Sequence, residues 1–162
     1  MVLTIGTPTP DQPAGAANVD PLRLWFRFIR LHRRVSAAIA AEMKPLGLSI
    51  PQFDLLSTLT EAGGVTQQEL AQRLYVTKGN VSGLVDRLVE AGLVERRRSP
   101  GDRRSHALHL TSDGRALAER AMALQERYVR ETLGSLPASD LVALERLVLS
   151  WRDSARKREN GT

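Results

Sequence analysis

After the first 19 residues, a single stretch of this 162-residue chain departs from the helical pattern that the rest follows. Over most of the chain, apolar residues recur every three or four positions, which is the period of an amphipathic α-helix. Two segments instead suit strands, 93–96 and 105–110, and the turn-forming sequence Ser-Pro-Gly-Asp at 99–102 lies between them. Aromatic residues make up only 4% of the chain, while alanine and leucine are abundant, which favours helices over a β-sandwich. The predicted fold is therefore mainly α-helical with one small β-hairpin.

Capping signals divide the helical part of the chain into six helices. Asp20 and Pro21 suit the start of a long first helix, which proline and glycine end near residues 44–47. Ser49 and Thr66 each begin a capping box, in which Gln or Glu follows three positions later. The expected helices run from Pro21 to about residue 44, from Ser49 to Gly63, from Thr66 to Leu74, from 78 to 91, from Thr111 to about Leu133, and from 139 to 157.

The N-terminal segment, residues 1–19, contains three prolines and two glycines, and we interpret it as a flexible arm. It has neither a basic region nor a continuous apolar run of the kind that a secretory signal needs. No apolar run in the chain approaches the roughly 20 residues that cross a bilayer. The absence of cysteine excludes disulfides, thiolate zinc sites and cysteine-based redox sensing. The expected location is the cytoplasm of a bacterial or archaeal cell, with no membrane partner.

The charge balance is compatible with an anionic partner. The formal net charge is +5 and the sequence pI is about 10.4. Only three of the 23 basic residues are lysines, and arginine is the better side chain for bidentate contacts with phosphates and base edges. Genome composition can also favour arginine, so this excess is weak evidence by itself.

Residues 66–91 contain two short helices joined by about three residues, and the basic hairpin follows at once. This order is typical of the winged helix-turn-helix. Polar side chains at the start of the second helix can reach base edges or phosphates, whereas Arg87 and Arg73 are placed to clamp phosphates. The predicted DNA-contacting residues are Thr66, Gln67, Thr77, Lys78, Gly79, Asn80, Ser82, Arg87, Arg98, Asp102, Arg103 and Arg104.

The alternative is that these residues form an ordinary surface helix and a solvated charge run. A helix-turn-helix pattern alone does not decide between the two. The hairpin favours DNA binding, because three arginines enter its turn and two leave it within nine residues, 96–104. Solvation explains such a tip poorly, whereas arginine inserted into a narrow minor groove explains it well.

Several separate motifs resemble the MarR (multiple antibiotic resistance regulator) family. The run DRRSHALHLTSDG is similar to the wing signature of that family, and KPLGLSIPQFDLLSTL, VTQQELAQRL, NVSGLVDRLVEAGLVERR and LPASDLVALERL match other family segments in the same order. The resemblance covers residues 22–152. It implies a homodimeric transcriptional regulator that binds double-stranded, pseudo-palindromic operator DNA and is released by a small, often phenolic, ligand.

The resemblance also implies roles for individual residues. Arg104 resembles the wing arginine that enters the minor groove, Asp102 resembles the acid that orients it, and the helix at 78–91 resembles the reader of the major groove. Branches of the family that sense peroxide use cysteine, and a metal-sensing branch uses Cys, Glu and His ligands. This chain has no cysteine and only three histidines, His32, His106 and His109. No metal and no cofactor are therefore expected.

The remaining predictions concern dimerisation and a ligand. Apolar stripes on the first and the last two helices are too long for so small a domain to bury, so residues 20–48 and 112–158 are predicted to form a helical dimerisation region. Residues 49–111 are predicted to form the DNA-binding lobe. Trp25 and His32 on the first helix, with Phe53 on the second, are the candidate ligand-binding residues.

The sequence leaves two other classes of function to compare with a ligand-controlled regulator. The chain has no Gly-rich phosphate loop, HExxH, G-x-S-x-G or cysteine nucleophile, so it is not expected to be an enzyme. The second alternative is an architectural DNA-binding protein that acts without a ligand. A ligand-induced thermal shift would separate that function from a ligand-controlled regulator.

Overall fold

The computed structural model describes residues 19–99 and 102–161, so the predicted N-terminal arm lies almost wholly outside the described residues. Contacts divide the chain into two units, one up to Ala38 and one from Ile39 onward. The first helix crosses this boundary, and its last turn belongs to the second unit.

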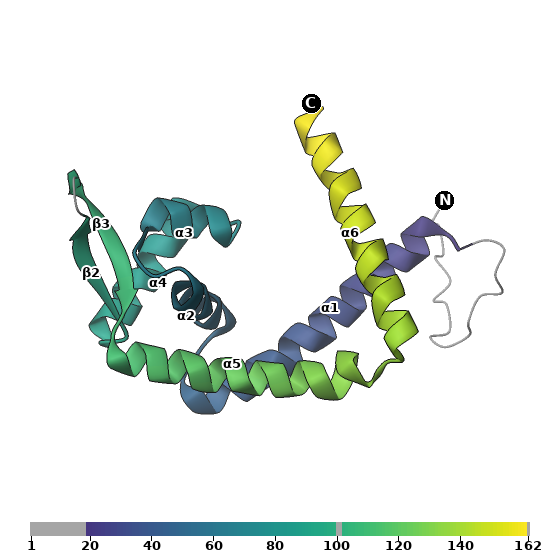
Figure 1. The fold of residues 1–162 in the computed structure, drawn as a ribbon, viewed down its shortest axis with the longest axis horizontal. Helices are drawn as coiled ribbons and strands as arrows, with labels where there is room; N and C mark the ends of the chain where they lie inside the picture. Colours follow the sequence, from purple (N-terminus) through teal and green to yellow (C-terminus); the bar gives the residue numbers. More distant parts are fainter. Residues whose placement is uncertain (1–18, 100–101, 162) are drawn as a thin grey trace, which may run out of the picture. The chain divides into compact units, whose positions relative to one another are not determined.

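The six predicted helices are all present, and the predicted mainly α-helical fold is confirmed (Figure 1). Both predicted capping boxes form: the Gln52 N–H donates to Ser49 Oγ at 3.4 Å, and the Glu69 N–H donates to Thr66 Oγ1 at 3.2 Å. Two short 3-10 helices, Lys44–Leu46 and Leu133–Ser135, follow the first and fifth helices. The α-helices are α1 (Pro21–Met43), α2 (Ile50–Glu61), α3 (Gln67–Arg73), α4 (Lys78–Glu90), α5 (Ser112–Thr132) and α6 (Ala138–Asn160).

The predicted hairpin belongs to a three-stranded antiparallel sheet in the order β1-β3-β2. Its strands, β2 (Val94–Ser99) and β3 (Asp102–Leu110), are longer than predicted and take in residues at both ends of the expected turn. The third strand, β1 (Val65–Thr66), was not predicted, because two residues are too short to display a period. β1 pairs with β3 through Val65 opposite Leu108, and this pairing joins the hairpin to the start of α3.

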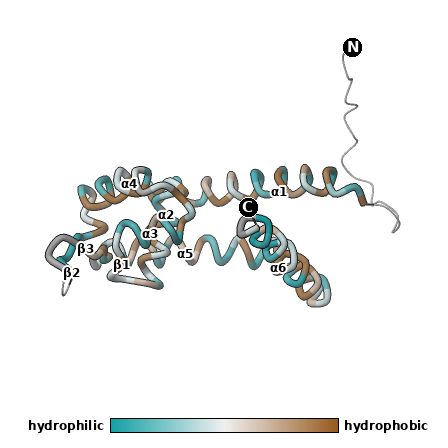
Figure 2. The backbone as a smooth tube through the Cα atoms, turned by 90° about the horizontal axis from the view of Figure 1, so that it is seen from above, coloured by the Kyte–Doolittle hydropathy of each residue, from teal (hydrophilic) through white to brown (hydrophobic). Residues whose placement is uncertain are grey.

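The core lies between α2, α3, α4, the sheet and the first half of α5. Val81, Val85 and Leu88 of α4 are fully buried, as predicted, and Leu84 is half-buried. Figure 2 shows the corresponding alternation of apolar and polar residues along the helices. The largest fully buried side chains are Phe53, Met43, Leu55, Leu56, Leu59, Leu70, Leu88, Leu108, Val81, Val85 and Val94.

The long helices outside this core carry exposed apolar residues. On α1, Leu22, Phe26 and Leu31 are each more than half exposed, and α6 has no buried residue between Ala138 and Arg158. None of the helices in the described part of the chain is long and apolar enough to span a membrane. No other part of the described chain therefore covers the apolar stripes on α1 and α6.

Candidate nucleic-acid interface

The start of α4 is an exposed, polar end of the second helix of the helix-turn-helix. Thr77 caps it by accepting the Asn80 N–H at 3.4 Å through Oγ1, which leaves the Thr77 hydroxyl proton available to another acceptor. Gly79, Asn80 and Arg87 are exposed, whereas Ser82 is half-buried. Because Val81, Val85 and Leu88 face the core, this surface lies on the opposite side of α4. The N-terminus of α4 carries a partial positive charge from the helix dipole, which favours anions such as phosphates.

The first turn of α3 uses its polar groups for its own cap. The Thr66 hydroxyl donates to Glu69 Oε2 at 2.9 Å, and the Thr66 backbone N–H donates to the same oxygen at 2.7 Å. These two bonds, the backbone one first, hold the pKa of Glu69 below its ordinary value. In this arrangement the Thr66 hydroxyl has no proton left to donate to a phosphate. Thr66 and the half-exposed Gln67 remain predicted contacts, and Gln67 has the more accessible functional group.

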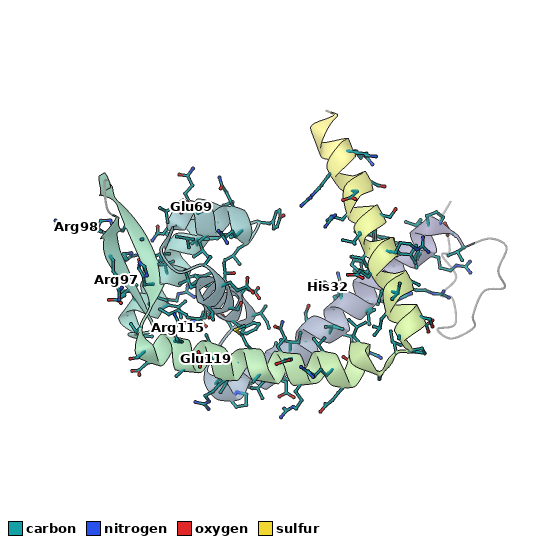
Figure 3. The ribbon with its side chains drawn as sticks, viewed as in Figure 1. His32, Glu69, Arg97, Arg98, Arg115 and Glu119 are labelled. Atoms are coloured by element: carbon teal, nitrogen blue, oxygen red, sulfur yellow. The ribbon has the colours of Figure 1, made fainter. Side chains whose placement is uncertain are left out.

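The wing is tied to α4 by an ion pair between Arg96 of β2 and Asp86 of α4, which was not predicted. Arg97 lies on the opposite face of the strand and pairs with Glu95 at 2.5 Å. Arg98 is exposed and lies opposite His106 in the strand register. Figure 3 shows Arg98 closer to the hairpin tip than Arg97, with its side chain directed outward. The Asp86–Arg96 pair thus links β2 to α4, while Arg98 can meet an external anion.

Four predicted contacts are described in their backbone alone. Asp102, Arg103 and Arg104 open β3, and Lys78 is the first residue of α4, but their side chains lie outside the described part of the structure. Ser99 pairs with Asp102 after a register shift that begins at Arg98. The backbone therefore brings these residues to the wing tip and to the start of α4, where the predictions require them.

A close contact joins the end of the wing to α5. Thr111 caps α5 by accepting the Gly114 N–H at 3.0 Å, and its own hydroxyl donates to the Gly92 carbonyl at 2.7 Å. The Thr111 N–H donates to the Leu93 carbonyl at 3.1 Å. A Cβ atom on Gly114 would lie 1.9 Å from that same carbonyl oxygen. The first turn of α5 and the turn between α4 and β2 can therefore approach only because residue 114 has no side chain.

The candidate ligand residues lie on both units. On α1, the rings of Trp25 and Phe28 are 6.2 Å apart, and those of Phe28 and His32 are stacked at 6.5 Å, so Phe28 connects the two predicted residues. Phe53 belongs to the other unit and is only 2% exposed. A ligand that reached Phe53 would therefore have to open the core around it.

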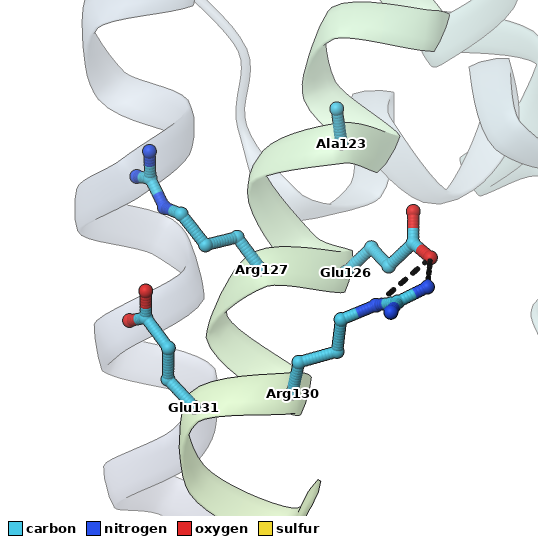
Figure 4. Close-up of a pocket in the computed structure, with 5 residues that line it drawn as sticks. All are labelled: Ala123, Glu126, Arg127, Arg130 and Glu131. Carbon is cyan, nitrogen blue, oxygen red and sulfur yellow. Dashed lines mark hydrogen bonds and ion pairs between the residues drawn. The ribbon is translucent and has the colours of Figure 1, made fainter.

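A hollow lies along α5 (Figure 4) and is lined by Ala123, Glu126, Arg127, Arg130 and Glu131. Arg130 pairs with Glu126 at 2.5 Å, and Arg127 pairs with Glu42 at 3.1 Å. The charges of this hollow are thus balanced locally, which gives an anion little to bind. No cluster of His, Asp or Glu that could hold a metal ion occurs among the described residues.

Comparisons with known proteins agree with this geometry. A model of the MarR family matches residues 46–105. The HTH-type transcriptional repressor Rv2887 of Mycobacterium tuberculosis is 31% identical over 129 residues, which are 80% of this chain and 93% of the relative.

Two solved structures have the same fold. Wild-type MarR of E. coli is 28% identical with a TM-score of 0.68, over 82% of this chain and 98% of that one. CouR from Rhodococcus jostii, solved with p-coumaroyl-CoA bound, is also 28% identical with a TM-score of 0.68, over 82% of this chain and 89% of that one. The winged helix-turn-helix of this chain is thus that of a transcriptional regulator, and the chain belongs to the MarR family.

Proposed function

We propose that the protein is a homodimeric repressor that binds a pseudo-palindromic operator and is released by a small aromatic ligand. The observation that carries the DNA-binding part is the exposed polar start of α4 beside a wing rich in arginine. In this proposal α4 enters the major groove, and the wing tip lies over the adjacent minor groove. The repressor role is supported by the relatives named transcriptional repressors, such as Rv2887.

Dimerisation is supported by the apolar surfaces that the single chain leaves exposed. Residues 49–111 would form the DNA-binding lobe, and residues 20–48 together with 112–158 would form the dimerisation region. A two-fold axis would present two copies of α4 to half-sites about one helical turn apart, roughly 10–10.5 base pairs. The pseudo-palindromic form of the operator follows from that symmetry.

The wing supplies the direct test of this function. Arg104→Ala is expected to weaken operator binding by about 1–3 kcal/mol while leaving the fold unchanged, because an arginine at the wing tip contributes to binding and not to the core. Asp102→Ala is expected to have a similar effect by freeing the orientation of Arg104. Titration of the DNA flanking the protein's own coding region, near physiological salt, measures both.

The matched control for Arg104→Ala is Arg120→Ala on α5. Arg120 is exposed and lies outside the helix-turn-helix and the wing, so this variant loses the same charge without losing a predicted contact. Arg120→Ala is expected to change the affinity little. Equal affinities for Arg104→Ala and wild type would exclude the minor-groove role of Arg104.

The effector part of the proposal is supported by local chemistry and by CouR. The row of Trp25, Phe28 and His32 offers aromatic surface, and α1 carries five arginines with no acidic residue between Pro21 and Ala41. CouR was solved with p-coumaroyl-CoA, which combines a phenolic p-coumaroyl group with the negatively charged phosphates of CoA. An exposed aromatic surface beside several cations suits such a ligand.

A panel of phenolic acids, benzoic acids and p-coumaroyl-CoA tests this effector. A member is expected to raise the melting temperature and to weaken DNA binding about tenfold, which corresponds to about 1.4 kcal/mol of coupling between the two sites. Trp25→Ala is expected to remove both effects. If no member bound at millimolar concentration, the alternative of an architectural DNA-binding protein without a ligand would be favoured.

A further inference from the structure

Tyr75 takes a backbone conformation that usually belongs to glycine. At the end of α3, the Val76 N–H donates to the Ala71 carbonyl at 3.1 Å, and the Tyr75 N–H donates to the Gln72 carbonyl at 3.3 Å. These two bonds form a Schellman motif, in which the residue after the helix cap is left-handed. Tyr75 has φ +54° and is the only non-glycine residue with a positive φ in the described part of the chain.

Two other helical segments end in the same way, and both use glycine. The Leu48 N–H donates to the Met43 carbonyl around Gly47, and the Leu93 N–H donates to the Leu88 carbonyl around Gly92. The two glycines have φ values of 70° and 69°. A Cβ atom is disfavoured in this region because it approaches the following carbonyl oxygen. Glycine at position 75 would therefore suit the turn better than tyrosine does.

Packing does not account for the tyrosine. Tyr75 is 88% exposed, more than any other large apolar or aromatic side chain described here. It stands two residues before Thr77, the cap at the exposed start of α4. An unfavourable backbone conformation that persists without a packing reason points to a role in function.

We propose that Tyr75 contacts the DNA backbone by donating its phenolic O–H to a phosphate oxygen beside the major groove that α4 enters. This inference rests on the proposed function. The first residues of a reading helix enter the groove, so the turn before them lies near the groove edge, where the sugar–phosphate strand runs. Tyrosine is one of the side chains that contact phosphates, and such contacts carry no sequence information. An uncharged donor releases no counterion, so its contribution is independent of salt.

The experiment compares Tyr75→Phe with wild type on two duplexes of equal length, one flanking the protein's own coding region and one with that sequence scrambled. Tyr75→Phe removes only the hydroxyl. Binding to both duplexes is expected to weaken about tenfold, with an unchanged melting temperature and an unchanged slope of log affinity against log salt. Arg87→Ala is the contrast, since losing a phosphate-binding cation is expected to reduce that slope by about one unit. Tyr128→Phe on α5 removes a hydroxyl far in sequence from α4, but Tyr128 is half-buried within the proposed dimerisation region, so sedimentation first checks that this variant is still a dimer. As a dimer, it is expected to bind both duplexes as wild type does.

Tyr75→Gly tests the backbone argument. Its DNA binding is expected to fall at least as far as that of Tyr75→Phe, while its melting temperature stays at or above the wild-type value. A clear drop in melting temperature would mean that the ring supports the fold, and would overturn the argument from strain. Unchanged DNA affinity for Tyr75→Phe, or a loss confined to one duplex, would overturn the phosphate contact alone. Wild-type protein that bound neither duplex at low salt would overturn the proposed function, and this inference with it.

Discussion

Gly114→Ala is expected to destabilise the protein by about 3 kcal/mol or more, a large share of the total stability of a typical domain. The added Cβ would lie 1.9 Å from the Leu93 carbonyl oxygen and 2.8 Å from the carbonyl carbon. Both are backbone atoms, so no side-chain rotation can make room. The first turn of α5 would have to move away, and the bonds of Thr111 to Gly92 and Leu93 would weaken with it. Thermal and denaturant unfolding measure the loss.

Gly83→Ala is the control for this substitution. No atom lies within 4 Å of a Cβ built at Gly83, which is exposed within α4. Alanine there is expected to stabilise the helix by roughly 0.5–1 kcal/mol, because glycine loses more backbone entropy on folding. The same chemical change thus has opposite signs at the two positions. A Gly114→Ala protein that melted within a degree or two of wild type would contradict the close approach of α5 to Leu93.

The helices could be predicted because their ends depend on residues close in sequence. Ser49 with Gln52 and Thr66 with Glu69 are capping boxes that can be recognised within four residues, and both form in the structure. The buried face of α4 follows in the same way from the spacing of Val81, Val85 and Leu88. Short-range chemistry is sufficient for these features.

The sheet could be predicted only in part, because strand pairing depends on residues far apart in sequence. Strand β1 exists because Val65 meets Leu108, and nothing near Val65 indicates that partner. The strands of the wing also extend farther than expected. Ser99 and Asp102 pair with each other, as the first and last residues of a four-residue turn do, so the two strands run up to both ends of the predicted turn.

For the candidate site, the sequence indicated which surface contacts DNA but not which of its side chains are already hydrogen-bonded or ion-paired within the protein. The start of α4 was predicted as the DNA-reading element, and it is exposed. The sequence did not show that the Thr66 hydroxyl is hydrogen-bonded within its own helix cap. It also did not show the ion pair of Asp86 with Arg96, which depends on how the wing packs against α4. Tyr75 had one sequence signal, its place just after a predicted helix end, where glycine is common.

Leu147→Asp is expected to raise the dissociation constant of the proposed dimer at least a hundredfold. Tight operator binding is expected to be lost with the dimer. Leu144, Leu147 and Val148 follow the i, i+3, i+4 spacing on α6, and in the single chain they are 40%, 55% and 51% exposed. A carboxylate at such an exposed position would be harmless to a monomer. In a dimer that buries the stripe, the same carboxylate would lose its water without gaining a partner, which costs several kcal/mol. Sedimentation at micromolar concentration measures the dissociation directly.

Val142→Asp separates loss of the stripe from added charge. Val142 is 66% exposed on the other side of α6, so the same carboxylate there leaves the stripe intact and is expected to leave the dimer intact. DNA titration of both variants then links assembly to function, since one half-site contacted by one copy of α4 gives only weak binding. A wild-type protein that sedimented as a monomer and still bound the operator tightly would contradict the proposal that a dimer binds the operator. So would a Leu147→Asp protein that remained a dimer, because the stripe would then not lie in the interface.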